Sequence, residues 1–145
     1  VVDPKQYSDR GEWDRALAAA IAPFDAEWVV SAGFMRILGE AVLSGHPQRI
    51  VNTHPALLPS FPGAHAVRDA LVYGVKVTGC TVHLVDSGVD TGPVLAQQAV
   101  AIEAGDDETS LHERIKSVEH ELLVSVVASL CRHDVQVIGR EVVFS

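Results

Sequence analysis

The chain has 145 residues, 48% of them hydrophobic, so it is long and apolar enough to form one domain, residues 1–145, around a core. Acidic residues outnumber basic ones 19 to 11, and the net charge of −8 argues against nucleic acids and anionic membranes as partners. The sequence shows no signal peptide and no apolar run of about eighteen residues that could span a membrane. Because Cys80 and Cys131 form no C-x-x-C pair, we expect reduced thiols and a soluble, cytoplasmic protein.

Helical and strand patterns alternate from the start of the chain. Pro4 argues against a helix in Val1–Tyr7. Asp9 is a suitable N-cap for an amphipathic helix over Arg10–Ala22. The apolar run at 28–32 is typical of a strand buried on both faces of a parallel sheet.

The next elements predict a parallel crossover. A short helix at 39–43 leads to a strand at 49–52, and this strand is expected to pair in parallel with 28–32 through a right-handed connection. A further helix is predicted at 64–73, where Gly74 can end it in the left-handed conformation.

The second half of the chain predicts a ribbon, a long helix and a hairpin. Two β-rich runs, 76–85 and 93–102, are interpreted as an antiparallel ribbon joined by a longer loop. The longest helix is predicted at 108–130 from its apolar stripe. The end of the chain, 135–144, is interpreted as a surface hairpin that turns at Gly139.

Polar side chains cluster where the strand at 49–52 ends. Asn52 and His54 are two residues apart, so they lie on the same face of an extended strand. Prolines in the segment 55–63 prevent both a helix and a central strand there, which places both side chains at a carboxyl strand end, where open α/β sheets bind ligands. The alternative is a histidine that only satisfies a backbone carbonyl beside a rigid turn.

The loop 86–92 presents two carboxylates, Asp86 and Asp90, between glycines. It does not fit a calcium loop, since Thr91 occupies the position of the sharp-turn glycine. A solvated acidic turn is one interpretation. If one carboxylate lies beside His54, it can orient the imidazole and favour its charged form, as acid–base chemistry requires.

Two other polar positions fit simple structural roles. His83 follows Cys80 at C-x-x-H spacing, but without a second such pair a zinc site is disfavoured, and a hydrogen-bonded core histidine is the better interpretation. Glu119 on the long helix is by itself consistent with a solvated face.

Four segments, in order and at matching intervals, resemble the folate-dependent phosphoribosylglycinamide formyltransferase family. No single one of them is specific enough, whereas the four together cover nearly the whole chain. The segments are Ala32–Leu38, Asn52–Pro59, Val85–Val94 and Glu119–His120.

The resemblance implies roles for individual residues. Asn52 matches the residue that hydrogen-bonds the formyl oxygen, His54 the general acid or base, and Asp90 the carboxylate that orients and charges that imidazole. Glu119 matches a residue that binds glycinamide ribonucleotide, and Arg10 matches an arginine near the nucleotide more weakly. The residues that match the pteridine pocket and the loop closing it are Met35, Arg36, Ile37, Leu38, Val85, Asp86, Gly88 and Val89.

The resemblance also implies a fold and a reaction. The fold is an α/β, Rossmann-like formyltransferase fold: a mostly parallel sheet with helices on both faces and an antiparallel ribbon, here with its N-terminal strands missing. The reaction is the transfer of a formyl group from 10-formyltetrahydrofolate, the co-substrate, to the amine of glycinamide ribonucleotide in purine synthesis. No metal is implied. A methionyl-tRNA formyltransferase is disfavoured because the chain is acidic.

One expected feature is missing from the sequence. Family members begin with a strand and a Gly-Ser-rich turn that holds the substrate phosphate. The chain is therefore interpreted as the catalytic and folate-binding portion of a longer protein, weak or inactive alone. Its exposed sheet edge could associate with a second copy, as a homodimer, or with the N-terminal piece. The alternatives are 10-formyltetrahydrofolate hydrolase, with water as acceptor, and a non-catalytic folate-binding fragment.

Overall fold

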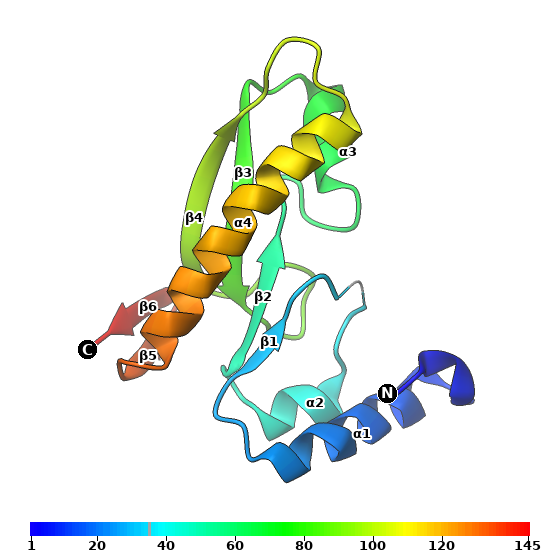
Figure 1. Cartoon of the computed structure of the whole chain (residues 1–145). Coiled ribbons are helices and arrows are strands. Elements are labelled where there is room, and N and C mark those ends of the chain that lie inside the picture. The colour runs from blue at the N-terminus through cyan, green and yellow to red at the C-terminus, as the bar shows by residue number, and fades with distance from the viewer. Residues whose placement is uncertain (35) are drawn as a thin grey trace.

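The computed structural model describes residues 1–34 and 36–145 (Figure 1). Short 3-10 helices at Pro4–Gln6 and Ala22–Phe24 flank the first α-helix. The main elements are α1 (Arg10–Ile21), β1 (Val29–Ser31), α2 (Glu40–Gly45), β2 (Ile50–His54), α3 (Ala66–Tyr73), β3 (Val77–Leu84), β4 (Val94–Ala101), α4 (Glu108–Leu130), β5 (Val135–Ile138) and β6 (Glu141–Phe144). The α/β class, the order of the elements and the C-terminal hairpin are as predicted.

The central sheet has four strands in the order β1-β2-β3-β4. The predicted β1–β2 pair is parallel and the predicted β3–β4 ribbon is antiparallel. The β2–β3 pair is antiparallel too, so in the described residues the sheet is mixed rather than mostly parallel. The physical reason is the connection: the segment 55–76 stays at the carboxyl end of β2, so β3 starts there and runs back alongside β2.

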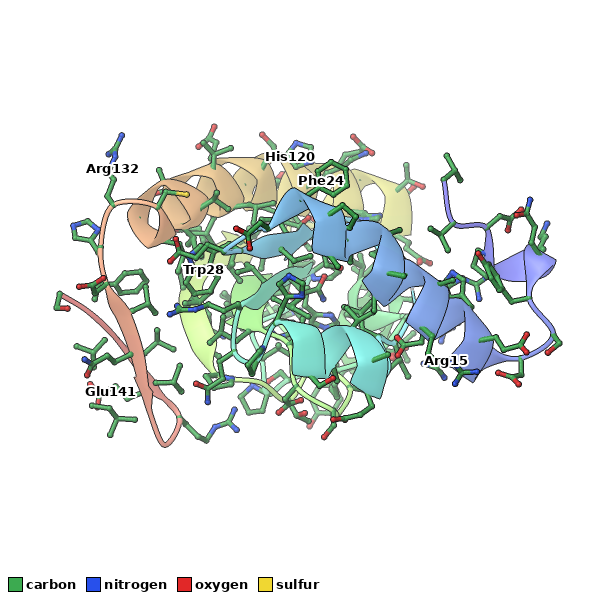
Figure 2. All side chains as sticks on the ribbon, turned by 90° about the horizontal axis from the view of Figure 1, so that it is seen from below. Arg15, Phe24, Trp28, His120, Arg132 and Glu141 are labelled. Carbon is green, nitrogen blue, oxygen red and sulfur yellow. The ribbon has the colours of Figure 1, made fainter. Side chains whose placement is uncertain are left out.

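Helices cover both faces of the sheet at β2, whereas β1, predicted to be buried on both faces, is a partly exposed edge strand with Val30 exposed. On one face Ile50 packs with Leu38 and Val42, beneath α1 and α2. The next residue, Val51, points to the opposite face and packs with Val126 of α4, since side chains alternate along a strand. In Figure 2 α4 and α2 lie on opposite sides of the sheet, and side chains fill the space between them.

Helix α4 forms where its apolar stripe predicts. Asp107 caps its start by accepting the Ser110 N–H at 2.8 Å, and the Ser110 hydroxyl accepts the Asp107 N–H at 3.0 Å. Leu111 and Ile115 are fully buried against β3 and β4. The β5–β6 hairpin packs on the other end of α4 (Figure 1). Among the described residues no helix, α4 included, is long and apolar enough to cross a membrane.

The expectation that Pro4 excludes a helix in Val1–Tyr7 is wrong. Pro4–Gln6 forms one 3-10 turn, and Asp3 caps it by accepting the Lys5 N–H at 3.0 Å. Proline is compatible with a first helical position because its missing N–H would have no partner there. Proline thus limits the length of a helix here, and does not prevent its first turn.

Replacing Asp106 by asparagine is expected to lower the melting temperature near neutral pH. Arg114 holds both carboxylate oxygens, at 2.7 and 2.8 Å, and keeps the pKa of Asp106 well below its usual range. A depressed folded-state pKa stabilises the fold above the unfolded pKa, near 4, and this stabilisation is lost as the pH falls toward the folded value.

The difference in melting temperature between parent and Asp106→Asn should therefore shrink steadily below about pH 4. Thermal unfolding followed by circular dichroism from pH 2 to 7 measures it. The exposed Asp134→Asn change is the control, since the Asp134 backbone, and not its side chain, pairs with Ser145. A pH-independent difference would contradict the expected linkage.

Candidate active site

The carboxyl end of β2 faces a cavity of about 730 Å³. Asn52 and His54 both line it. In the antiparallel register they lie opposite His83 and Thr81 of β3, respectively. Their common face is the one that the two-residue spacing predicts. The predicted amide and imidazole therefore open into one cavity at a strand end.

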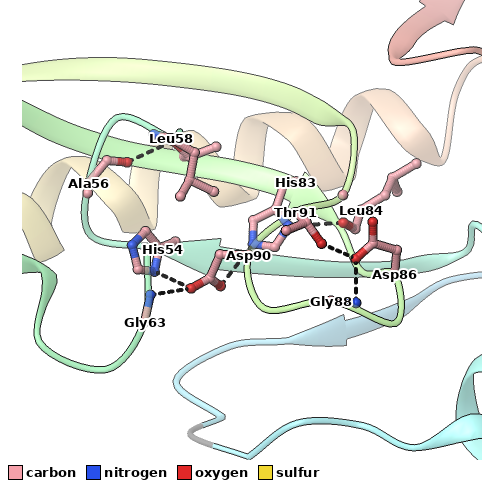
Figure 3. A network of polar contacts seen from close by, with 12 residues as sticks. His54, Ala56, Leu58, Gly63, His83, Leu84, Asp86, Gly88, Asp90 and Thr91 are labelled. Atoms are coloured by element: carbon pink, nitrogen blue, oxygen red, sulfur yellow. Dashed lines mark hydrogen bonds and ion pairs between the residues drawn. The ribbon is translucent and has the colours of Figure 1, made fainter. Parts of the chain in front are cut away.

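Both ring nitrogens of His54 face oxygen atoms that can only accept hydrogen bonds. Nε2 lies 2.7 Å from the Phe61 carbonyl oxygen, and Nδ1 lies 3.4 Å from Oδ2 of Asp90 (Figure 3). A neutral imidazole has one N–H and can serve only one of them. The charged imidazolium serves both, and its charge is opposite to that of the carboxylate. Two acceptors thus flank the ring and orient it toward the cavity edge of β2, as acid–base chemistry requires.

The two oxygens reach His54 from strained backbone positions. Phe61 has φ +50° and Asp90 has φ +54°, in the left-handed region that side chains with a Cβ rarely adopt. The Gly63 N–H donates to Oδ2 of Asp90 at 2.8 Å and ties the two segments together. Such strain persists only where the surroundings fix it and gathers at functional sites, which supports a functional reading of this contact.

The proline-rich turn after β2 is held by side chains of β3 and β4. The Thr81 hydroxyl donates to the Ala56 carbonyl at 2.7 Å and accepts the Leu58 N–H at 3.1 Å. Gln97 donates to the Leu58 carbonyl at 2.8 Å. These buried contacts fix the course of the turn, and with it the Phe61 carbonyl that meets His54.

The two carboxylates of loop 86–92 have different partners. Oδ1 of Asp86 accepts the Gly88 N–H at 3.0 Å and the Thr91 hydroxyl at 2.6 Å, so this residue makes the exposed, solvated turn. Asp90 is the carboxylate that turns inward to His54. The sequence left both interpretations open for the loop, and the structure gives each of them to a different aspartate (Figure 3).

The residues predicted to hold the folate are brought to the same cavity as Asn52 and His54. Met35 lies outside the described residues. The others that line the cavity are Arg36, Ile37, Leu38, Val85, Asp86, Gly88 and Val89. Segments fifty residues apart thus form its walls, and Leu38 also belongs to the core beneath α2.

The two residues predicted to meet the ribonucleotide are placed differently. Glu119 of α4 lines the cavity together with His54. Arg10, in the first turn of α1, donates to the Ile37 carbonyl at 2.7 Å and lines a separate hollow with Arg36. Arg10 therefore supports the segment that walls the cavity, and its contact with a nucleotide stays a prediction.

Several residues of the site were not predicted from sequence. On α4 the residues Glu108, His112 and Lys116 line the cavity beside the predicted Glu119. Their spacing of four, four and three residues is the signal of one helical face, and it could have identified them. His83 was expected in the core, where it is, but its Nε2 also lies 3.7 Å from Oδ1 of Asp90.

The C-terminal hairpin supports the base of the loop. Arg140 donates to the Thr91 carbonyl at 3.0 Å and to the Gly92 carbonyl at 3.3 Å. Arg140→Ala is expected to remove about 1 kcal/mol and to lower the melting temperature by about 2–4 °C. Arg132→Ala is the matched control, because Arg132 projects outward at the same end of the molecule (Figure 2). Equal melting temperatures for both variants would show that the loop does not need Arg140.

The sequence was compared with known protein families and structures. The profile of the formyl transferase family matches residues 1–127. The chain belongs to this family. A phosphoribosylglycinamide formyltransferase from Mycobacterium tuberculosis is 61% identical over 134 residues, which are 92% of this chain and 62% of the relative. The chain thus spans somewhat less than two thirds of the length of that relative, and the resemblance seen in the four sequence segments is confirmed.

Solved structures of the family share the fold. The glycinamide ribonucleotide transformylase 1 from Symbiobacterium toebii superimposes with a TM-score of 0.94 at 41% identity, over 98% of this chain and 67% of that one. A formyltetrahydrofolate deformylase from Pseudomonas syringae superimposes with a TM-score of 0.89 at 28% identity, over 99% of this chain and 47% of that one. The fold alone therefore does not distinguish transfer to an amine from hydrolysis.

Proposed function

We propose that this chain carries the catalytic and folate-binding part, residues 1–145, of an enzyme that transfers a formyl group from 10-formyltetrahydrofolate to the amine of glycinamide ribonucleotide. The observation that supports it most is the convergence of Asn52, His54 and Asp90 at one cavity, with both nitrogens of His54 facing acceptors. The 61% identity to the M. tuberculosis formyltransferase points to the same reaction.

The proposed chemistry needs one stabilised oxyanion and one proton transfer. The substrate amine attacks the formyl carbon, the carbonyl bond opens to a tetrahedral oxyanion, and the bond to the folate nitrogen N10 then breaks. Asn52 donates to the oxyanion and charged His54 stabilises it, where one well-placed donor is worth on the order of a hundred- to a thousandfold. The proton lost by the amine is matched by one delivered to N10, with His54 as the carrier.

The contacts of His54 suggest which nitrogen meets the substrate. Asp90 holds Nδ1, and the Gly63 N–H in turn anchors Asp90. Nε2 lies 2.7 Å from the Phe61 carbonyl oxygen, which is an uncharged acceptor. We therefore assign Nε2 to the reacting group and Nδ1 to Asp90, with substrate taking the place of the Phe61 oxygen.

The remaining walls of the cavity suit the two substrates. The apolar segment around Ile37 and Leu38 and the loop carrying Val89 offer a surface for the flat pteridine, while backbone groups of the loop can hydrogen-bond its edge. Glu119, across the cavity on α4, is positioned to accept hydrogen bonds from the ribonucleotide. Among the described residues no group of three or more His, Cys, Asp or Glu side chains could hold a metal ion.

The proposed compartment and partners of the enzyme rest on its thiols, its charge and its sheet edge. Cys80 and Cys131 are both free thiols, which suits the reducing cytoplasm. Its proposed partners are the two small-molecule substrates, and neither nucleic acid nor a membrane is among them. β1 lies at one edge of the sheet, where a homodimer contact stays a prediction.

The alternative function is hydrolysis of 10-formyltetrahydrofolate, which the structural match to the P. syringae deformylase keeps in view. The rate of tetrahydrofolate release, with and without glycinamide ribonucleotide, separates the two. It is measured with the chain alone and after the rest of the M. tuberculosis relative is joined to it. Release that requires the ribonucleotide supports the transferase, release without it supports the hydrolase, and folate binding without release in either form supports a binding fragment.

A further inference from the structure

Asp14 of α1 is a buried acidic residue that takes no part in the proposed reaction. It is only 4% exposed, which is unusual for an aspartate. Its Oδ1 accepts the Gly39 N–H at 2.7 Å, and its Oδ2 accepts the Ala41 N–H at 2.8 Å. Both amides stand at the start of α2, whose own N-cap, Gly39, has no side chain to accept them. Asp14 therefore caps α2 from the neighbouring helix (Figure 1).

The stretch that leads into this cap forms one wall of the cavity. Residues 36–38, the 36–38 wall, line the cavity directly before Gly39 and lie outside the helices and strands. Within this wall the apolar Ile37 is 44% exposed, which offers a surface to a flat ligand. Backbone groups in an irregular stretch need partners from other elements. The position of the 36–38 wall therefore depends on contacts with its neighbours.

Helix α1 holds the 36–38 wall at two points. Arg10 donates to the Ile37 carbonyl at 2.7 Å. Asp14 lies four residues later, on the same face of α1, and holds the Gly39 N–H. A Cβ added at Gly39 would lie 2.6 Å from Cγ and from Oδ2 of Asp14, closer than side chains pack. The carboxylate can thus reach this amide because position 39 is a glycine.

We propose that Asp14 is a positioning residue that fixes the 36–38 wall in the arrangement that binds the folate. The identity of the ligand rests on the proposed function, whereas the hold on the wall rests on the contacts of Asp14. A wall that is ordered in the free protein spares the ligand the cost of ordering it. When the wall is in place for only part of the time, the apparent affinity falls in proportion to that fraction.

Amide hydrogen exchange of the unchanged chain tests the contact itself. The N–H groups of Gly39 and Ala41 should exchange at least about a hundredfold more slowly than in an unstructured peptide, because a buried carboxylate accepts both. Exchange of either amide at the peptide rate would overturn the proposal. This measurement needs neither a ligand nor a variant.

The affinity for tetrahydrofolate, measured by calorimetry below the melting temperatures, tests the effect on the cavity. In Asp14→Ala both acceptors are lost, and the dissociation constant should rise about tenfold. Val126→Ala is the control, because it removes buried apolar contacts on the opposite face of the sheet and should change the constant by less than about twofold. Equal rises in both variants, or none in Asp14→Ala, would overturn the proposal.

Gly39→Ala disturbs the same contact from its other side. In the parent its Cβ must push the Asp14 carboxylate aside, so the affinity should fall about as far as in Asp14→Ala. In the Asp14→Ala background the atoms that this Cβ would meet are gone, and the added change should alter the constant by less than about twofold. Additive losses would overturn the proposal. Absent binding of tetrahydrofolate by the parent would instead count against the proposed function, and the amide exchange would still decide whether Asp14 holds the wall.

Discussion

Replacing His54 by alanine is expected to lower the rate of formyl transfer by about a hundred- to ten-thousandfold, the largest effect of any single change in the site. The variant would lose the proposed proton carrier and, with it, the positive charge proposed to stabilise the developing oxyanion. Asp90 then keeps the Gly63 N–H but has no cation, so its charge no longer assists the reaction. Steady-state rates of tetrahydrofolate formation by the chain joined to the rest of the M. tuberculosis relative, with both substrates saturating, measure the loss.

The loss must be separated from misfolding, since His54 is 4% exposed and its removal leaves a small void. The melting temperature and near-ultraviolet circular dichroism of the variant show whether the fold persists. His133→Ala is the matched control: this exposed histidine contacts Ser129 and Phe144 at the far end of α4, and its rate should equal that of the parent. A folded His54→Ala variant within tenfold of the parent rate would rule out His54 as the acid or charge carrier.

Gly92→Ala is expected to destabilise the chain by about 2–3 kcal/mol and to abolish most of the activity with it. A Cβ added at Gly92 would overlap the Leu84 carbonyl oxygen and lie 2.7 Å from the Leu84 carbonyl carbon. Both are backbone atoms at the buried end of β3, so neither can rotate away, and the loop itself must shift. Because Asp90 stands two residues earlier, its carboxylate would move away from His54.

Thermal unfolding should show a fall of roughly 5–10 °C for Gly92→Ala. Gly45→Ala provides the control, because a Cβ there meets no atom within 4 Å and alanine favours the helix. If both variants had the melting temperature of the parent, the close approach of Gly92 to the Leu84 carbonyl would be wrong. If Gly92→Ala melted normally yet lost activity, the displacement would be confined to the loop.

Local signals were sufficient for most of the elements. The apolar stripe predicted α4 with the bounds that it has, because helical periodicity depends only on neighbouring residues. The direction of β3 relative to β2 was not predicted. The direction depends on the end of the sheet at which the segment 55–76 meets β3, and no local sequence pattern encodes this. Pro4 shows the same limit on a smaller scale, since a residue that forbids helix interiors can still open a helical turn.

In the site, too, the local features could be predicted and the long-range contacts could not. The spacing of Asn52 and His54 predicted a shared face, because alternation along a strand is a local property. The loop by itself showed two carboxylates, and only the family resemblance singled out Asp90, since the inward turn depends on contacts with Gly63 and His54. His83 approaches Asp90 through the strand register, and Arg140 contacts the loop through the C-terminal hairpin; both bring distant residues together only in the folded chain.

The fate of the formyl carbon tests the proposed reaction most directly. With 10-formyltetrahydrofolate labelled with carbon-13 in the formyl group, carbon NMR follows that atom during a single turnover. The site predicts that the label moves from N10 of the folate to the amine of glycinamide ribonucleotide, and that it stays on the folate with the folded His54→Ala variant. Label released as free formate in the presence of the ribonucleotide would contradict transfer and establish hydrolysis instead.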